Sequence, residues 1–457
     1  MASFLSLSRP IDRKWFAGFS NYPTVGKLMA GSCSSAEICR NRFNSSFYPK
    51  GMRTLAEPIL SPSSIQNPSF SSSSPCLMLP PAFDVDVSGA ASINYKFYSL
   101  TDNKIITLST EKSNKEREEL TMWFRGSSHG WLALMCPRSR DLSLYNPISR
   151  RHIHLPSLGD LPNYPPNLPW ADKVILTCSP DEDGPNCRAV MIYNNMRGLA
   201  FCCPGLSKEW TRIGDHHWFD EDVGWAVSNG SYMDCVYSPR HEALFSLTQH
   251  GVLDSWDLRD PQSPRAVKIG EVVSLSHKRA RLGYPRTEEE EKKLRVMDET
   301  REHLVVAGQD LLVVTQYVVH SFDFDGLYVD SRDPNNLAYE RGLPGVTIDF
   351  DVHKYDPEDM DVKYVEGSSL GGWALFVGLH SDAVALPAAD FPELNPNSIY
   401  FTDAQEDSII EDFPTGGHDI GIFNYENKTV LPCYFPCDAK NLRKTFPAPM
   451  WFFPSRE

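Results

Sequence analysis

The chain has 457 residues, 41% of them hydrophobic, so it can bury a large core in one repeat domain or in two or three ordinary domains. No run approaches the roughly 18 consecutive apolar residues of a membrane-spanning helix, so no transmembrane segment is expected. Residues 1–53 carry eight Lys or Arg against two Asp or Glu, a charge of +6, which leaves −21 for the rest of a chain whose net charge is −15. Because the chain after residue 53 is this acidic, it repels the phosphate backbone, and nucleic acid is not expected as a partner.

The basic segment 1–53 has the composition of an organellar transit peptide. Wound as a helix, its first apolar residues recur at steps of four on one face, namely Leu7, Ile11, Trp15 and Phe19. Arg9, Arg13 and Lys14 supply early positive charge, which favours a mitochondrial address and makes the import machinery an expected partner. A chloroplast address, or an ordinary N-terminus of a protein in the cytosol or nucleus, is the alternative.

Residues 54–82 are predicted to form a linker, because positions 61–75 hold eight serines and three prolines. The folded domain is expected to span 83–457. Its charged stretch 277–303 is predicted to be an inserted helix or loop.

Short apolar-alternating segments recur along this domain. In one of them Leu132, Leu134 and Cys136 alternate with smaller residues, and Asn146-Pro147 marks a turn. About 20 to 24 such strands, grouped in fours, predict an all-β fold, a β-propeller of about five to seven four-stranded blades behind a disordered presequence. Two stacked β-sandwiches are the rival architecture.

The dipeptide Gly-Trp occurs at 130–131, 224–225 and 372–373, each time before an apolar alternation. We interpret the three as equivalent strands of different blades, with each indole packed between neighbouring sheets.

Candidate chemical sites are weak. The eleven cysteines lack paired zinc spacing, and Asp323-Phe324-Asp325-Gly326 lacks the Glu that a calcium loop needs. Clusters at 215–222, at His152 with His154 and at 356–361 are interpreted as polar edges or solvated loops. No nucleophile elbow or phosphate-binding loop occurs. The sequence therefore predicts no catalytic residue, no cofactor and no metal site.

Several motifs resemble a known family. They are 128–132 (Ser-His-Gly-Trp-Leu), 144–147 (Leu-Tyr-Asn-Pro), 152–156 (His-Ile-His-Leu-Pro), 397–403 (Asn-Ser-Ile-Tyr-Phe-Thr-Asp), 419–424 (Asp-Ile-Gly-Ile-Phe-Asn) and the ending 447–455. In order and spacing they resemble the plant domain of unknown function 295, the KIB-type β-propeller of many F-box proteins. Residues 1–80 show no F-box pattern, so the organelle-targeted branch is the better comparison.

The resemblance implies structural roles for six residues, Gly130, Trp131, Asn146, Pro147, Tyr400 and Trp451. Asn146-Pro147 would set a turn, Tyr400 and Trp451 would fill the space between blades, and the C-terminal strand would close the ring.

We expect a monomeric, non-enzymatic mitochondrial scaffold that binds a protein partner. One alternative is an F-box-like adaptor of a ubiquitin ligase in cytosol or nucleus. The other is a propeller enzyme whose site lies in the central channel.

Overall fold

The computed structural model describes residues 74–86, 88–111, 122–159, 161, 170–215, 217–220, 225–228, 231–249, 251–260, 264–271, 298–319, 345–365, 369–403, 417–431, 433 and 447–455. The expected transit peptide lies outside these ranges. None of the helical structure within them is long and apolar enough to cross a membrane.

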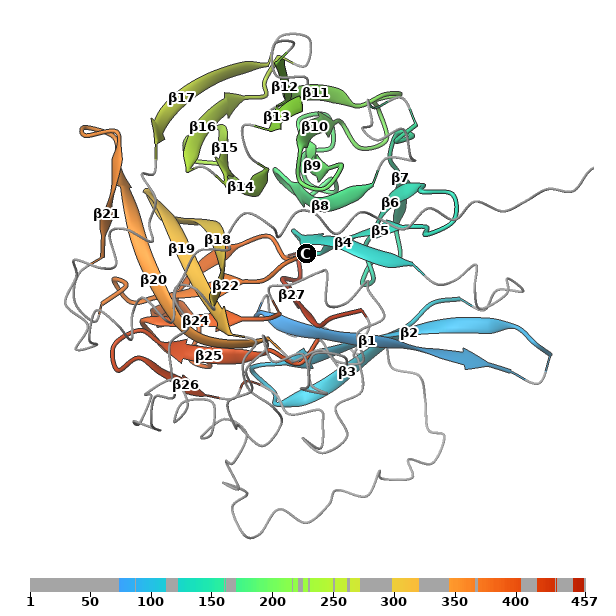
Figure 1. Ribbon diagram of the computed structural model, residues 1–457. Coiled ribbons are helices and arrows are strands. Elements are labelled where there is room, and N and C mark those ends of the chain that lie inside the picture. The colour runs from blue at the N-terminus through green and yellow to red at the C-terminus, as the bar shows by residue number, and fades with distance from the viewer. Residues whose placement is uncertain are drawn as a thin grey trace, which may run out of the picture.

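The described strands form sheets arranged around a centre (Figure 1). Blade 1 has the order β27-β1-β2-β3, with β27 Met450–Phe452, β1 Cys76–Val85, β2 Ala91–Ser99 and β3 Lys104–Ser109. Blade 2 contains β4 Trp123–Ser128, β5 Trp131–Met135, β6 Leu142–Tyr145 and β7 His152–His154. Blade 3 contains β8 Ala171–Leu176, β9 Ala189–Tyr193, β10 Gly198–Cys202 and β11 Thr211–Asp215.

The other half of the ring is less regular. Blade 4 contains β14 Tyr232–Ser238, β15 Ala243–Thr248, β16 Val252–Asp257 and β17 Arg265–Glu271. A nine-stranded sheet follows, which a short parallel contact between β18 and β23 divides into two blades. Blade 5 contains β18 Asp298–Ala307, β19 Asp310–Val319, β20 Val346–Asp356 and β21 Asp361–Tyr364. Blade 6 contains β22 Trp373–Val377, β23 Val384–Pro387, β24 Ser398–Phe401, β25 Gly421–Asn424 and β26 Thr429–Leu431.

The described residues thus make six blades, within the predicted range, and blade 6 has five strands. The all-β propeller expected from the sequence is confirmed.

Packing between blades explains why several strands are apolar at every position. In β5, Trp131, Ala133 and Met135 join a core shared with blade 3, whereas Leu132 and Leu134 join a core shared with blade 1. All five are buried, because both faces of a blade lie against a neighbour.

The C-terminal strand closes the ring, as predicted. Cys76 pairs with Phe452, and Met78 pairs with Met450 in an antiparallel ladder. The core of blade 1 is thereby completed by the two ends of the folded domain, and β1 has no free inner edge.

Two expected boundaries differ from the structure. The domain begins at Cys76 rather than residue 83, because the apolar start of β1 pairs with both β2 and β27. The charged stretch 277–303 ends earlier than expected, because residues from Asp298 onward form β18 and pair with β19. Ladder pairing outweighs the charged composition there.

The three Gly-Trp dipeptides are not equivalent, which corrects that interpretation. Trp131 begins the second strand of blade 2, and Trp373 begins β22 of blade 6. Trp225 begins β13 (Trp225–Ser228), which among the described strands pairs with β12 (His217–Asp220) in a separate two-stranded sheet.

Candidate functional site

Gly130 lies in the turn between β4 and β5, where it meets the C-terminal segment. His129 and Gly130 have φ values of 50° and 77°, as a tight two-residue hairpin requires. Ser455 donates a hydrogen bond of 2.7 Å to the carbonyl of His129. A Cβ at Gly130 would come within 2.7 Å of the Ser455 nitrogen, so glycine permits this contact.

The other motif residues lie at a turn and in a core. The side chain of Asn146 accepts hydrogen bonds from the backbone of Ile148 and Ser149, at 2.9 and 3.0 Å, around Pro147. The rings of Tyr400 and Trp451 lie 6.0 Å apart in a core that joins blades 1 and 6.

A segment of six residues, 378–383, joins β22 to β23 and contacts strands β4 and β27 of other blades; we call it the central segment. The backbone nitrogen of Ser127 in blade 2 donates to the carbonyl of His380 at 2.9 Å. Ser381 accepts a hydrogen bond of 2.9 Å from the Trp451 nitrogen of blade 1. Directly afterwards, β23 pairs with β18 of blade 5. The central segment therefore contacts blades 1 and 2, and the strand that follows it contacts blade 5.

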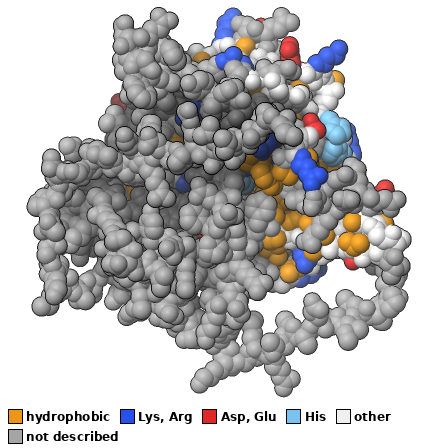
Figure 2. Space-filling model, turned by 45° about the vertical axis from the view of Figure 1, so that its right-hand side comes forward, with side chains coloured by type: hydrophobic (Ala, Val, Ile, Leu, Met, Phe, Trp, Pro, Cys, Tyr) orange, Lys and Arg blue, Asp and Glu red, His pale blue; other side chains and the backbone are white. Residues whose placement is uncertain are grey.

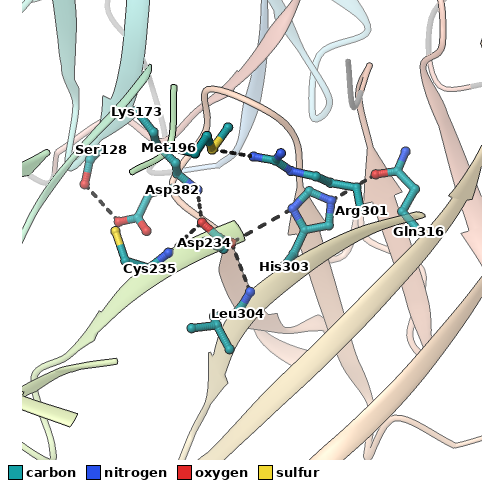
Figure 3. A network of polar contacts seen from close by, with 10 residues as sticks. All are labelled: Ser128, Lys173, Met196, Asp234, Cys235, Arg301, His303, Leu304, Gln316 and Asp382. Atoms are coloured by element: carbon teal, nitrogen blue, oxygen red, sulfur yellow. Dashed lines mark hydrogen bonds and ion pairs between the residues drawn. The ribbon is translucent and has the colours of Figure 1, made fainter. Parts of the chain in front are cut away.

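A buried ion pair lies beside this segment (Figure 3). The ammonium of Lys173 on β8 donates to Asp234 Oδ1 on β14 at 2.6 Å, and each side chain is 2% exposed. Asp234 Oδ2 also accepts a hydrogen bond of 2.9 Å from the Leu304 nitrogen on β18. One carboxylate thus ties together the inner strands of blades 3, 4 and 5.

The polar chain continues outward through blade 5. His303 Nε2 donates to Gln316 Oε1 at 3.0 Å, and Gln316 Nε2 donates to the Thr347 hydroxyl at 2.7 Å. The Thr347 nitrogen donates to Asp419 Oδ2 at 3.0 Å. Burial lowers the pKa of His303 to about 4, although Asp234 opposes the shift, so the ring is neutral near pH 7.

Ser128 and Asp382 form a second contact in the same region (Figure 3). Ser128 donates to Asp382 Oδ2 at 2.9 Å and accepts from the Leu176 nitrogen at 3.2 Å. Burial raises the pKa of Asp382. Because these groups are buried and mostly bonded to one another, the arrangement is suited to holding blades together rather than to meeting a solvent-borne substrate.

A different cluster reaches the surface between blades 2 and 3; we call Trp123, Arg125, Arg140 and Trp170 the Trp–Arg cluster. The indoles of Trp123 and Trp170 lie 4.5 Å apart, at the starts of the inner strands β4 and β8. The guanidinium of Arg140 lies 4.3 Å from the Trp170 ring centroid, and that of Arg125 lies 4.6 Å from it. Both distances are typical of cation–π contacts.

The two arginines differ in exposure. Arg125 is buried, and burial lowers its pKa to about 9, with Asp172 opposing and Arg140 reinforcing the shift. Arg140 and both tryptophans are half-buried. Among the described residues, nothing forms a hydrogen bond with Arg140 Nη1. Because this nitrogen is itself buried, the cluster presents the exposed parts of the two indoles and of the Arg140 side chain.

Two of the polar clusters that the sequence offered, His152 with His154 and residues 356–361, lie on an outer strand and around an exposed turn. His152 and His154 lie on outer strand β7 with their rings 4.6 Å apart, and no three His, Cys, Asp or Glu side chains meet as metal ligands in the described part of the chain. Asp356 and Asp359 both bind Lys363 on an exposed turn, and the first of these pairs lowers the pKa of Asp356. Arg9, Arg13 and Lys14 lie outside the described residues.

Sequence reasoning missed both the central segment and the Trp–Arg cluster. Trp123 begins the buried strand β4, Trp170 directly precedes β8, and Arg140 follows Arg138 in a polar turn, which are weak local signals. Their convergence depends on β4 and β8 being neighbours in the ring. On the face drawn in Figure 2, hydrophobic side chains reach the surface with Lys or Arg beside them.

Comparison with solved structures adds distant similarities. Apo AztD from Citrobacter koseri is 12% identical, with a TM-score of 0.32, over 67% of this chain and 75% of that one. The major Malassezia sympodialis allergen Mala s 1 is 10% identical, with a TM-score of 0.32, over 82% and 88%. No curated protein matches the sequence.

The decisive match is to a family profile. The KIB1-4 beta-propeller profile matches residues 97–424, which include strands of all six blades. The propeller fold supports, in general terms, a scaffold for protein interaction. By this match and by its ring of sheets, the chain belongs to the KIB1-4 beta-propeller family.

Proposed function

We propose that the protein is a non-enzymatic mitochondrial scaffold that binds a protein partner at the Trp–Arg cluster. The observation that carries the proposal is the half-buried indole pair of Trp123 and Trp170, with Arg140 stacked on it. Tryptophan and arginine are the residue types most enriched in energetic centres of interfaces. The inner strands β4 and β8 position the two tryptophans, and Arg140 reaches them from the turn between β5 and β6.

The electrostatics of the cluster suit an acidic partner segment. Arg125 and Arg140 approach the same indoles, and the buried carboxylate of Asp172 acts on Arg125. A carboxylate of the partner next to an apolar side chain would meet Arg140 and cover the aromatic surface at once. The buried, mutually bonded groups at the centre of the ring support a binding role over a catalytic one.

Binding is tested with the full-length chain in isolated plant mitochondria. Proximity labelling by the wild-type protein should recover a partner that is lost from the Trp170→Ala and Arg140→Ala variants. The matched control is Arg259→Ala, whose side chain is 71% exposed on another blade and which should retain the partner. Binding of the purified partner should weaken by about 30-fold or more in the Trp170 variant. Equal labelling by all variants, with melting temperatures unchanged, would contradict the proposal.

The mitochondrial address rests on the basic segment 1–53. Fused to a fluorescent protein, this segment should direct it to mitochondria, and replacing Arg9, Arg13 and Lys14 by Glu should abolish import. Signal in chloroplasts, or throughout the cytosol and nucleus, would refute the address. Recovery of cullin-complex subunits by the full chain would favour the ligase-adaptor alternative instead.

A further inference from the structure

Two cysteines face each other at the end of the β8–β9 hairpin. Leu176 pairs with Ala189, and the Thr177 nitrogen donates to the Arg188 carbonyl at 2.9 Å. One step further along the hairpin, Cys178 stands opposite Cys187. Opposed residues of antiparallel strands have Cα atoms about 4.5 to 5.5 Å apart, within the usual range for a disulfide.

The two thiols already interact. The Cys187 thiol donates a hydrogen bond of 3.1 Å to the carbonyl oxygen of Cys178. Hydrogen bonding from the Cys187 thiol also lowers the pKa of Cys178 to about 7, against the effect of burial. It raises the pKa of Cys187, as does burial. The pair therefore has one thiolate-prone sulfur and one protonated neighbour.

Access to the pair is asymmetric. Cys178 is half-buried, whereas Cys187 is fully buried. An oxidant can thus reach Cys178 first, and Cys187 is positioned to react with the product. The turn 179–186 between them also holds Asp181, whose carboxylate binds Arg151 of blade 2. Locking this turn would fix a contact between two blades.

We propose that Cys178 and Cys187 form a reversible disulfide when the protein meets a peroxide. The Cys178 thiolate attacks one peroxide oxygen, the O–O bond breaks, and a sulfenic acid and hydroxide result. The Cys187 sulfur then attacks the Cys178 sulfur and displaces the sulfenic oxygen. Together the two thiols lose two electrons and two protons, and hydrogen peroxide becomes two waters. A dithiol reductant reverses the reaction by exchange.

The sequence allows a direct readout. Trypsin, cutting after Lys173 and Arg188, releases both cysteines in one peptide, 174–188. The full-length reduced protein, alkylated and digested, should give this peptide with two alkyl groups. After treatment with hydrogen peroxide it should carry none and weigh two hydrogens less, and dithiothreitol should restore the first form. Cleavage at Asp or Glu within the turn should then give two peptides joined by the disulfide.

Variants make the test specific. In Cys187→Ser, Cys178 should accumulate as a sulfenic acid that dimedone traps. In Cys136→Ser, which removes another half-buried thiol, the disulfide should form as in the wild type. The oxidised wild type should melt a few degrees higher than the reduced form, because the disulfide closes a short loop. Two alkylatable thiols after peroxide treatment, or a disulfide from Cys178 to any other cysteine, would overturn the proposal.

Discussion

Replacing Trp451 by Ala should destabilise the protein severely, because this indole anchors the closing strand. Its side chain is 0% exposed, and its ring lies 5.1 Å from Phe376 and 6.0 Å from Tyr400. Truncation of such a buried aromatic costs about 3 to 5 kcal/mol, a large share of the 5 to 15 kcal/mol typical of a whole domain. Deleting 447–457 should be worse and give insoluble protein, whereas deleting 1–73 should leave a soluble body.

Urea unfolding of the full-length variants, followed by tryptophan fluorescence and circular dichroism, measures the effect. Trp451→Phe is the informative comparison, because Trp451 Nε1 has no hydrogen-bond partner among the described residues and phenylalanine keeps an aromatic ring. The free energy of unfolding of Trp451→Phe should therefore fall much less than that of Trp451→Ala. Leu431→Ala, at a side chain 47% exposed on β26, should change stability by at most about 0.5 kcal/mol. If Trp451→Ala unfolds within about 1 kcal/mol of the wild type, β27 does not hold the ring closed.

Three further predictions concern the interior. Because the folded-state pKa of His303 is about 4, below its ordinary 6.5, the unfolded chain takes up this proton first as pH falls. Stability should therefore drop by about 3 kcal/mol between pH 6.5 and 4, and His303→Gln should flatten that dependence in urea titrations. Asp234→Asn should cost about 3 kcal/mol by leaving the Lys173 ammonium buried without a counterion, and adding Lys173→Met should restore most of it; equal stability of the single and double variants would refute the coupling. Gly130→Ala should lower the melting temperature more than Gly89→Ala. Both glycines have positive φ, but a Cβ at residue 130 meets the Ser455 hydroxyl oxygen at 2.2 Å, whereas one at residue 89 meets nothing within 4 Å. Equal shifts in melting temperature would show that the contact between Gly130 and the C-terminal segment does not contribute to stability.

Local sequence was sufficient for the fold class. Apolar runs such as 131–135, bounded by turns at Gly130 and before Arg140, indicate strand and turn directly, because backbone conformation depends mainly on near neighbours. The ending 447–455 also suggested closure, and the ladder between β27 and β1 confirms it. The prediction of a helix or loop over the charged stretch 277–303 was wrong from Asp298 onward, because Asp298 pairs with Val319 in a strand ladder.

The candidate site was decided by tertiary structure alone. Residues 378–383 carry none of the motifs singled out in the sequence, and only the ring brings Ser381 to the Trp451 nitrogen. Trp123 meets Trp170 because blades 2 and 3 are adjacent, and Asp234 finds Lys173 61 residues away. Sequence periodicity specifies which face of a strand is apolar, but not which distant strand will cover it. That choice follows from the summed packing of whole blades, which no short window contains.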